Sequence, residues 1–104
     1  EQEELRAMFF NTKQVLIKEL LVSRGTVNAS LATPREIFIE ALRYRAVSLI
    51  LVHNHPSGDP SPSREDVAFT KRVRLAGEVV GIALLDHIII GDNAFMSLKE
   101  RGML

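Results

Sequence analysis

Cysteine is missing from this chain of 104 residues. Its absence excludes disulfides, thiolate nucleophiles and cysteine-based zinc sites together, so a metal ion must be held by histidine and carboxylate side chains. A chain without cysteine also fits a reducing compartment, and we expect a cytoplasmic protein.

An excess of one charge and a long apolar run are lacking as well. Thirteen basic residues balance thirteen acidic ones, so no global positive field draws the chain onto nucleic acid. The longest apolar run, from Ile82 to Ile90, is interrupted by Asp86 and His87 and is far too short to span a bilayer. The acidic start of the chain differs from a signal peptide. We therefore predict no membrane partner.

The apolar residues that are present suffice for one core. Their share of 46% and the length of 104 residues are those of one ordinary domain, in which we look for one site. The chain begins abruptly with the charged residues 1–4, just ahead of a strand pattern. We therefore expect an N-terminal module that is missing from this sequence.

The pattern of apolar and turn residues predicts the element order ββαβαββ, an α/β fold with a mixed β-sheet and flanking helices. We expect strands at residues 5–10, 15–23, 47–52, 84–90 and 94–98, and helices at residues 34–46 and 63–76. Both helix starts have the pattern of a capping box, Thr33 with Glu36 and Ser63 with Asp66.

Proline and glycine mark the breaks between these elements. Three of the four prolines lie between residues 54 and 62, which must therefore form a rigid loop. Gly77 and Gly81 are expected to end the second helix.

Two histidines, His53 and His55, follow the buried strand directly. Residues two apart on an extended chain point to the same side, so both imidazoles can reach one ion. Asp66 lies in the first turn of the next helix, and the proline-rich loop can fold this turn back over the strand end. Two histidines and one carboxylate, with no fourth protein ligand, are the pattern of a catalytic zinc site that keeps one position open for water. Amide hydrolysis is the natural task of such a site.

Such a site also needs a general base that is not a ligand. Glu4, Glu19 and Glu36 are candidates, and chemistry alone does not choose among them. Ser63 is a candidate donor to a developing oxyanion. Taken alone, Ser63 and Asp66 would be assigned to the helix cap, and an Asp66 bound to zinc cannot also turn back fully to cap.

Other polar groups have ordinary structural explanations. His87 is interpreted as a structural residue, and the basic stretch from Lys71 to Arg74 as the solvated face of a helix. The string HNH does not indicate an HNH nuclease, because that name refers to residues well separated along the chain.

The pattern H-x-H-P-x(6)-S-x-x-D, formed here by His53, His55, Pro56, Ser63 and Asp66, resembles the JAMM (MPN-plus) motif. With the strings SRGT, LLDHIIIGD and KERGML, the whole chain, residues 1–104, resembles a single domain, the C-terminal domain of RadC proteins. The resemblance implies a JAMM/MPN αβα sandwich related to the cytidine deaminases. It also implies one Zn²⁺ per chain, bound by the two histidines and the aspartate, with the serine assisting the transition state.

The resemblance further implies a glutamate, at the start of the first core strand, that handles the proton of the zinc-bound water. Glu4 is our choice for this general base and Glu3 is the fallback. Adjacent residues of a strand point to opposite sides, so only one of them can face the metal.

The predicted function is that of a zinc-dependent metallopeptidase or isopeptidase, acting on a peptide or isopeptide substrate. The alternative is a DNA repair or recombination accessory domain. Full-length RadC proteins resemble fusions with an N-terminal helix-hairpin-helix module, and DNA would be contacted through this missing module. A third hypothesis is a binding module in which the metal only staples the proline-rich loop. Deamination is excluded, because the cysteine ligands of a deaminase are absent.

Overall fold

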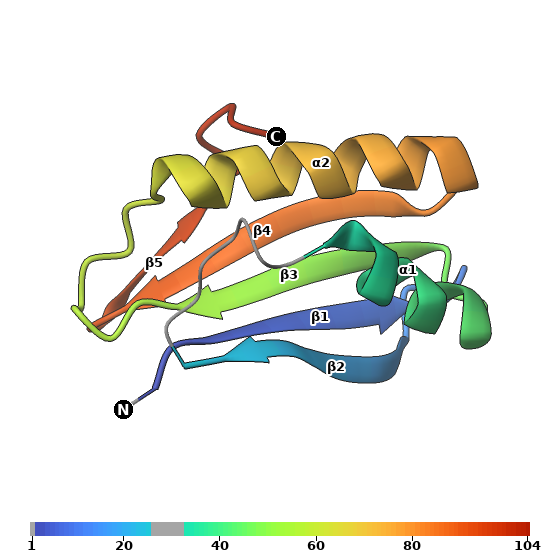
Figure 1. Ribbon diagram of the computed structural model, residues 1–104, viewed down its shortest axis with the longest axis horizontal. Coiled ribbons are helices and arrows are strands. Elements are labelled where there is room, and N and C mark those ends of the chain that lie inside the picture. Colours follow the sequence, from blue (N-terminus) through green and yellow to red (C-terminus); the bar gives the residue numbers. More distant parts are fainter. Residues whose placement is uncertain (1, 26–32) are drawn as a thin grey trace.

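The computed structural model of the chain describes residues 2–25 and 33–104. The strands are β1 (Glu4–Phe10), β2 (Leu16–Arg24), β3 (Ser48–Asn54), β4 (Ala83–Gly91) and β5 (Ala94–Ser97), and the helices are α1 (Pro34–Arg43) and α2 (Arg64–Val80) (Figure 1). The predicted order ββαβαββ is confirmed. Within the described residues, no helix has the length and apolarity needed to cross a membrane.

The strands form a five-stranded mixed sheet with the order β2-β1-β3-β4-β5. Strand β1 pairs antiparallel with both β2 and β3, whereas β3 and β4 are parallel and β4 and β5 are antiparallel. Helix α2 forms the crossover between the two parallel strands. As a result, the start of β1 lies beside the ends of β3 and β4, at one edge of the sheet.

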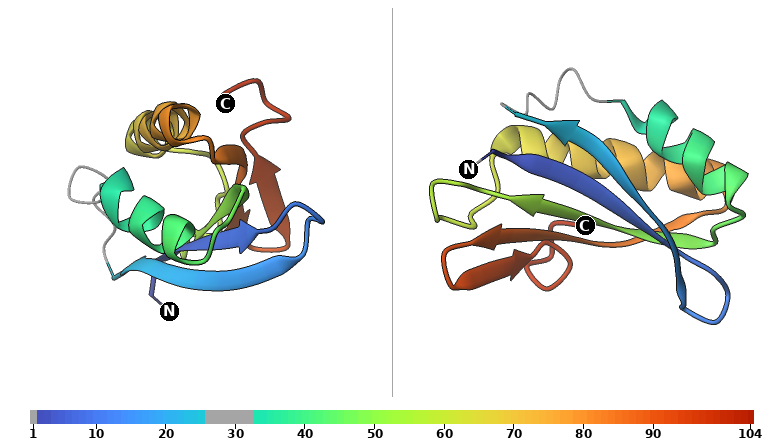
Figure 2. Two further views of the ribbon diagram at one scale, coloured as in Figure 1. Left: turned by 90° about the vertical axis from the view of Figure 1, so that its right-hand side faces the viewer. Right: turned by 90° about the horizontal axis from the view of Figure 1, so that it is seen from below.

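Both helices pack against the same face of the sheet (Figure 2). The predicted α/β fold, a mixed sheet with flanking helices, is therefore confirmed. In the described part of the chain the fold therefore has two layers, one of helices and one of strands. No described helix covers the opposite face of the sheet, as a helix would in a complete αβα sandwich.

Strand alternation places one face of β1 in the core. Leu5, Ala7 and Phe9 of β1 are buried under the helices, and the residues between them are half-exposed. The rest of this core comes from β3 and the two helices, and includes Leu49, Leu51, Ile37, Phe38, Ala41, Phe69 and Val73. Burying a large apolar side chain contributes roughly 1.5–3 kcal/mol. This packing holds α2 over the strands that carry the histidines.

The start of α1 differs from the predicted capping box. Thr33 makes no capping hydrogen bond with its side chain, and instead its hydroxyl donates to the carboxylate of Glu36 over 2.8 Å. The helix also ends at Arg43 rather than near residue 46, because the chain turns at Arg45 with a φ of 56°.

Helix α2 continues beyond its predicted end. It passes through Gly77 and ends at Gly81, which has the left-handed conformation with a φ of 81° that glycine adopts readily. Gly77 does not break the helix. A Cβ at this position would lie 2.2 Å from the carbonyl oxygen of Ile82, so glycine permits the close approach of the Ile82 backbone to the helix.

A second close approach joins the proline-rich loop to the β4–β5 hairpin. The amide of Asp92 donates to the carbonyl oxygen of Gly58 over 2.9 Å. A Cβ at Gly91 would lie 2.2 Å from that same oxygen. The loop that follows His55 is thus seated directly on the backbone at the end of β4.

We predict that Gly91→Ala lowers the free energy of unfolding by about 1–3 kcal/mol, the usual cost of inserting a methyl group into a packed contact. The cause is the collision with the backbone oxygen of Gly58. Urea denaturation measures the change. The control is Ala94→Ser at the exposed residue paired with Gly91, which should leave stability unchanged; equal stability of the two variants would contradict the prediction.

Candidate metal centre

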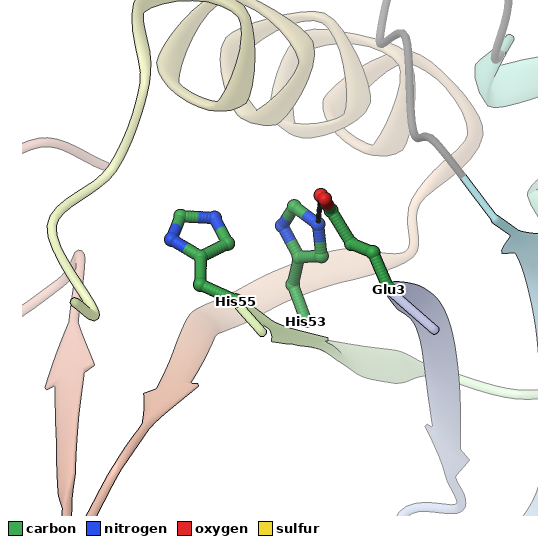
Figure 3. A group of neighbouring side chains, drawn as sticks. All are labelled: Glu3, His53 and His55. Atoms are coloured by element: carbon green, nitrogen blue, oxygen red, sulfur yellow. Dashed lines mark hydrogen bonds and ion pairs between the residues drawn. The ribbon is translucent and has the colours of Figure 1, made fainter. Parts of the chain in front are cut away.

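The three predicted metal ligands come together at the edge where β3 ends. His53 and His55 point to the same side of β3, as strand alternation requires, and the first turn of α2 places Asp66 against both rings. Asp66 Oδ1 lies 3.3 Å from His53 Nδ1, and Asp66 Oδ2 lies 3.2 Å from His55 Nε2. Figure 3 shows the two rings beside Glu3, which precedes β1.

The proline-rich loop determines which nitrogen of His55 faces the site. Nδ1 of His55 lies 3.0 Å from the carbonyl oxygen of Asp59. A carbonyl oxygen only accepts, so Nδ1 carries the hydrogen and donates it. In neutral His55 the other nitrogen, Nε2, then offers a lone pair toward Asp66. A backbone carbonyl that holds the remote N–H in this way is typical of metal-binding histidines.

His53 lies between two carboxylates. Its Nε2 is 2.5 Å from Oε2 of Glu3, and its Nδ1 faces Asp66. The side chain is only 2% exposed. Burial alone would lower the pKa of His53, but the hydrogen bond and charge of Asp66, followed by those of Glu3, outweigh it and raise the pKa. The environment of His53 therefore favours positive charge.

Asp66 serves the site and the helix cap at once. Its Oδ2 accepts a hydrogen bond of 2.8 Å from the amide of Ser63, and its own amide donates to Ser63 Oγ over 3.0 Å. The predicted capping box is confirmed. Oδ1 is turned to His53, whereas Oδ2 both accepts from the cap and faces His55, so the cap and the site share this carboxylate.

The carboxyl group of Asp66 is held in its ionised form. Burial raises its pKa, but hydrogen bonds from His53 and from the Ser63 amide outweigh burial and move the pKa well below its ordinary value. The site therefore contains a carboxylate, and not a carboxylic acid, at neutral pH.

Nε2 of His55 lies 3.2 Å from an ionised oxygen of Asp66. Because the hydrogen on Nδ1 is donated to the loop carbonyl, Nε2 needs either its own proton or a metal ion between it and this oxygen. Zinc bonds to nitrogen and oxygen measure about 2.0–2.1 Å, so two donors on one tetrahedral zinc are about 3.3–3.4 Å apart. The distances from Asp66 to the two rings, 3.3 Å from Oδ1 to His53 and 3.2 Å from Oδ2 to His55, are close to this value.

A second group of three residues has metal-ligand spacing. One ligand atom each from Glu3, His53 and His55 lies within 4.8 Å of the others. Glu3 is thus close enough to act on whatever the histidines bind.

The choice of Glu4 as the residue facing the site was wrong. The carboxylate of Glu4 accepts from Arg6 and from Arg24, over 2.9 Å each. Hydrogen bonds from Arg6, then from Arg24, lower its pKa. The fallback Glu3 faces His53 instead. Alternation did separate the two, but the register that pairs Leu5 with His53 decides which one points inward.

Asn54 is a positioning residue that the sequence did not reveal. Its Nδ2 donates to the carbonyl oxygen of Gln2 over 3.0 Å, and its Oδ1 accepts from the amide of Glu4 over 2.6 Å. The side chain therefore grips the backbone on both sides of Glu3. The asparagine between the two histidines is the only signal that the sequence offers for this role.

Ser63 lies at the border of the site. Its Oγ accepts from the Asp66 amide, which leaves the hydroxyl hydrogen free to donate elsewhere. The residue is exposed. It also lines a shallow pocket of about 390 Å³ along α2, together with Arg64, Val67 and Lys71. A substrate can therefore reach the hydroxyl group from solvent.

Beneath His53 lies the third histidine of the chain, His87 on β4. The two rings stack with their centroids 5.8 Å apart. Burial, and then the positive charge that His53 can carry, lower the pKa of His87 to about 4. His87 is therefore neutral at pH 7, and its burial agrees with the structural interpretation.

Comparison with known proteins places this geometry in a family. Over 102 residues the chain is 56% identical to a UPF0758 protein of Shouchella clausii, covering 98% of this chain and 44% of the relative. A UPF0758 protein of Desulforamulus reducens is 54% identical over 104 residues, 100% of this chain and 46% of the relative. The chain thus spans less than half the length of these relatives. Residues 1–103 match the RadC-like JAB domain, and the chain belongs to this family.

Proposed function

We propose that this chain is the catalytic domain of a zinc-dependent hydrolase that cleaves peptide or isopeptide bonds. The convergence of the Asp66 carboxylate on both His53 and His55 at the end of β3 carries the proposal. Membership of the RadC-like JAB family supports it.

The residues that would hold the zinc ion are His53, His55 and Asp66. Two neutral imidazoles and one carboxylate are an ordinary ligand set for catalytic zinc. When bound, zinc would supply Lewis acidity, which polarises the scissile carbonyl and lowers the pKa of a water molecule.

Glu3 is the general base of the proposed reaction. Its carboxylate contacts the ring of His53, yet the side chain is 27% exposed and so has access to water. Glu3 accepts a proton from the attacking water and later delivers it to the leaving amine. The leaving nitrogen is the lysine ε-amine of an isopeptide or the α-amine of a peptide.

Ser63 is the proposed oxyanion donor. Its free hydroxyl hydrogen can point at the oxygen of the tetrahedral intermediate while Oγ keeps the amide of Asp66. The helix cap fixes the position of this hydroxyl group, so little reorganisation is needed during the reaction.

Metal content tests the proposed ligands first. We expect about one zinc per wild-type chain and almost none in Asp66→Asn, because the amide keeps an oxygen for the Ser63 cap but loses the negative charge. Plasma mass spectrometry on protein purified without added metal measures the ratio. The matched control is Glu78→Gln on the exposed side of α2, which should keep its zinc. A wild-type chain that takes up no zinc, even when zinc is offered, would refute the proposed function.

The two neighbouring glutamates give a sharp test of the general base. Glu3→Gln should retain zinc and lose hydrolysis by about 10²–10⁴-fold, the usual contribution of a general base. Glu4→Gln should retain both, because Glu4 is bound to Arg6 and Arg24. Fluorogenic peptides and lysine-linked isopeptides are the substrates. Loss of turnover in Glu4→Gln alone would mean that the base had been assigned to the wrong strand face.

Removal of the Asn54 clamp should affect Glu3 without removing the metal. In Asn54→Ala the amide of Glu4 loses its partner, so its hydrogen exchange should accelerate and hydrolysis should fall by up to about 100-fold through misplacement of Glu3. Asn54→Asp keeps the acceptor for the amide of Glu4. Its exchange rate and its hydrolytic activity should therefore lie between those of Asn54→Ala and the wild type. Unchanged exchange at Glu4 together with full activity would show that the clamp has no role.

A further inference from the structure

A buried relay of two hydrogen bonds, formed by His87 and Thr70, leads from β4 to the backbone of Asp66. His87 is 1% exposed and Thr70 is 0% exposed. His87 Nδ1 lies 2.6 Å from Thr70 Oγ1, and Thr70 Oγ1 lies 2.6 Å from the carbonyl oxygen of Asp66. These two residues therefore connect the strand beneath the site to the helix turn that carries the carboxylate.

The hydrogen atoms of this relay have one consistent arrangement. The carbonyl oxygen of Asp66 can only accept, so the single hydroxyl hydrogen of Thr70 must point to it. The oxygen of Thr70 is then left to accept, and Nδ1 of His87 must donate to it. His87 is therefore the Nδ1–H tautomer, and each hydrogen bond points toward Asp66.

The environment of the other nitrogen, Nε2, makes this tautomer the state of His87 with the lowest free energy. Nε2 is buried and has no hydrogen-bond partner among the described residues. A hydrogen on this nitrogen, in the other tautomer or in the imidazolium, would be an unsatisfied donor in the interior. A back-bond from a helical threonine to the carbonyl four residues earlier is common by itself. A buried histidine that donates to that threonine is a more specific arrangement.

We propose that His87 and Thr70 are positioning residues for Asp66 in the metal centre. The relay anchors the carbonyl of Asp66 to β4, and the ring of His87 also stacks on His53 of β3. The relay thereby sets the distance between the carboxylate and the two proposed ligand histidines. This inference rests on the proposed zinc site. It assigns to that site two residues that would not bind the metal themselves.

Zinc affinity, measured by titration against a chromophoric chelator, tests the relay without any substrate. Thr70→Val keeps the shape of the side chain and removes the hydroxyl group, and we expect it to weaken zinc binding by about 10–100-fold, as is usual for outer partners of metal ligands. Thr70→Ser keeps the hydroxyl group and should restore most of the affinity. His87→Leu should resemble Thr70→Val, whereas His87→Asn keeps a donor near the position of Nδ1 and should bind more tightly than His87→Leu.

A control separates positioning from a general loss of stability. Val73→Ala removes buried volume one turn further along α2, where the side chain is fully buried, without touching the relay. It should lower the melting temperature and leave zinc affinity close to that of the wild type. If Val73→Ala weakens zinc binding as much as Thr70→Val at a similar loss of stability, the positioning role is refuted.

The tautomer is a second and independent readout. Long-range ¹H–¹⁵N correlation spectra of the metal-free protein at pH 7 should show the Nδ1–H form for His87, and the Nε2–H form or an imidazolium would overturn the relay. If the wild type binds zinc and Thr70→Val binds it equally well, only this inference fails. If the wild type binds no zinc, the proposed function fails and the positioning role falls with it.

Discussion

The position of one carboxylate relative to two imidazoles is the constraint on which the rest of the structure depends. Asp66 must reach both His53 and His55 from another element, at distances of 3.2–3.3 Å. The parallel pairing of β3 and β4 makes this feasible, because α2 starts its crossover at the edge where β3 ends. The glycine contacts, the helix cap and the buried relay each remove one way in which α2 could shift relative to that edge.

These supports act on different parts of the same turn. The cap holds the side chain and amide of Asp66, the relay from His87 holds its carbonyl oxygen, and the loop carbonyl of Asp59 orients His55. On the other side of the site, Asn54 grips the backbone around Glu3. A site built in this way pre-positions its groups, so less free energy is needed for rearrangement when a ligand binds.

The sequence predicted the elements and the placing of His53 and His55 well, because both depend on short-range patterns. Alternation predicted β1, and the spacing of His53 and His55 predicted that both rings would share one side of β3. It could not decide between Glu3 and Glu4, since that depends on the register of β1 against β3, a contact between residues about fifty positions apart. The end of α2 was missed for a similar reason, because the close approach of Ile82 to Gly77 exists only in the folded chain.

The charge between the carboxylate and the imidazoles is the last question that the geometry addresses. Protons alone satisfy the acceptors only if both His53 and His55 are charged, with their ring centroids 4.8 Å apart. The mutual repulsion of two imidazolium ions opposes that state, whereas Asp66 and Glu3 favour a positive charge on His53. One divalent cation held by His53 and His55 would bring the same total charge to a single point and would leave both rings neutral. A metal ion is therefore our proposal for this position, and the buried, neutral His87 beneath His53 adds no further positive charge to the site.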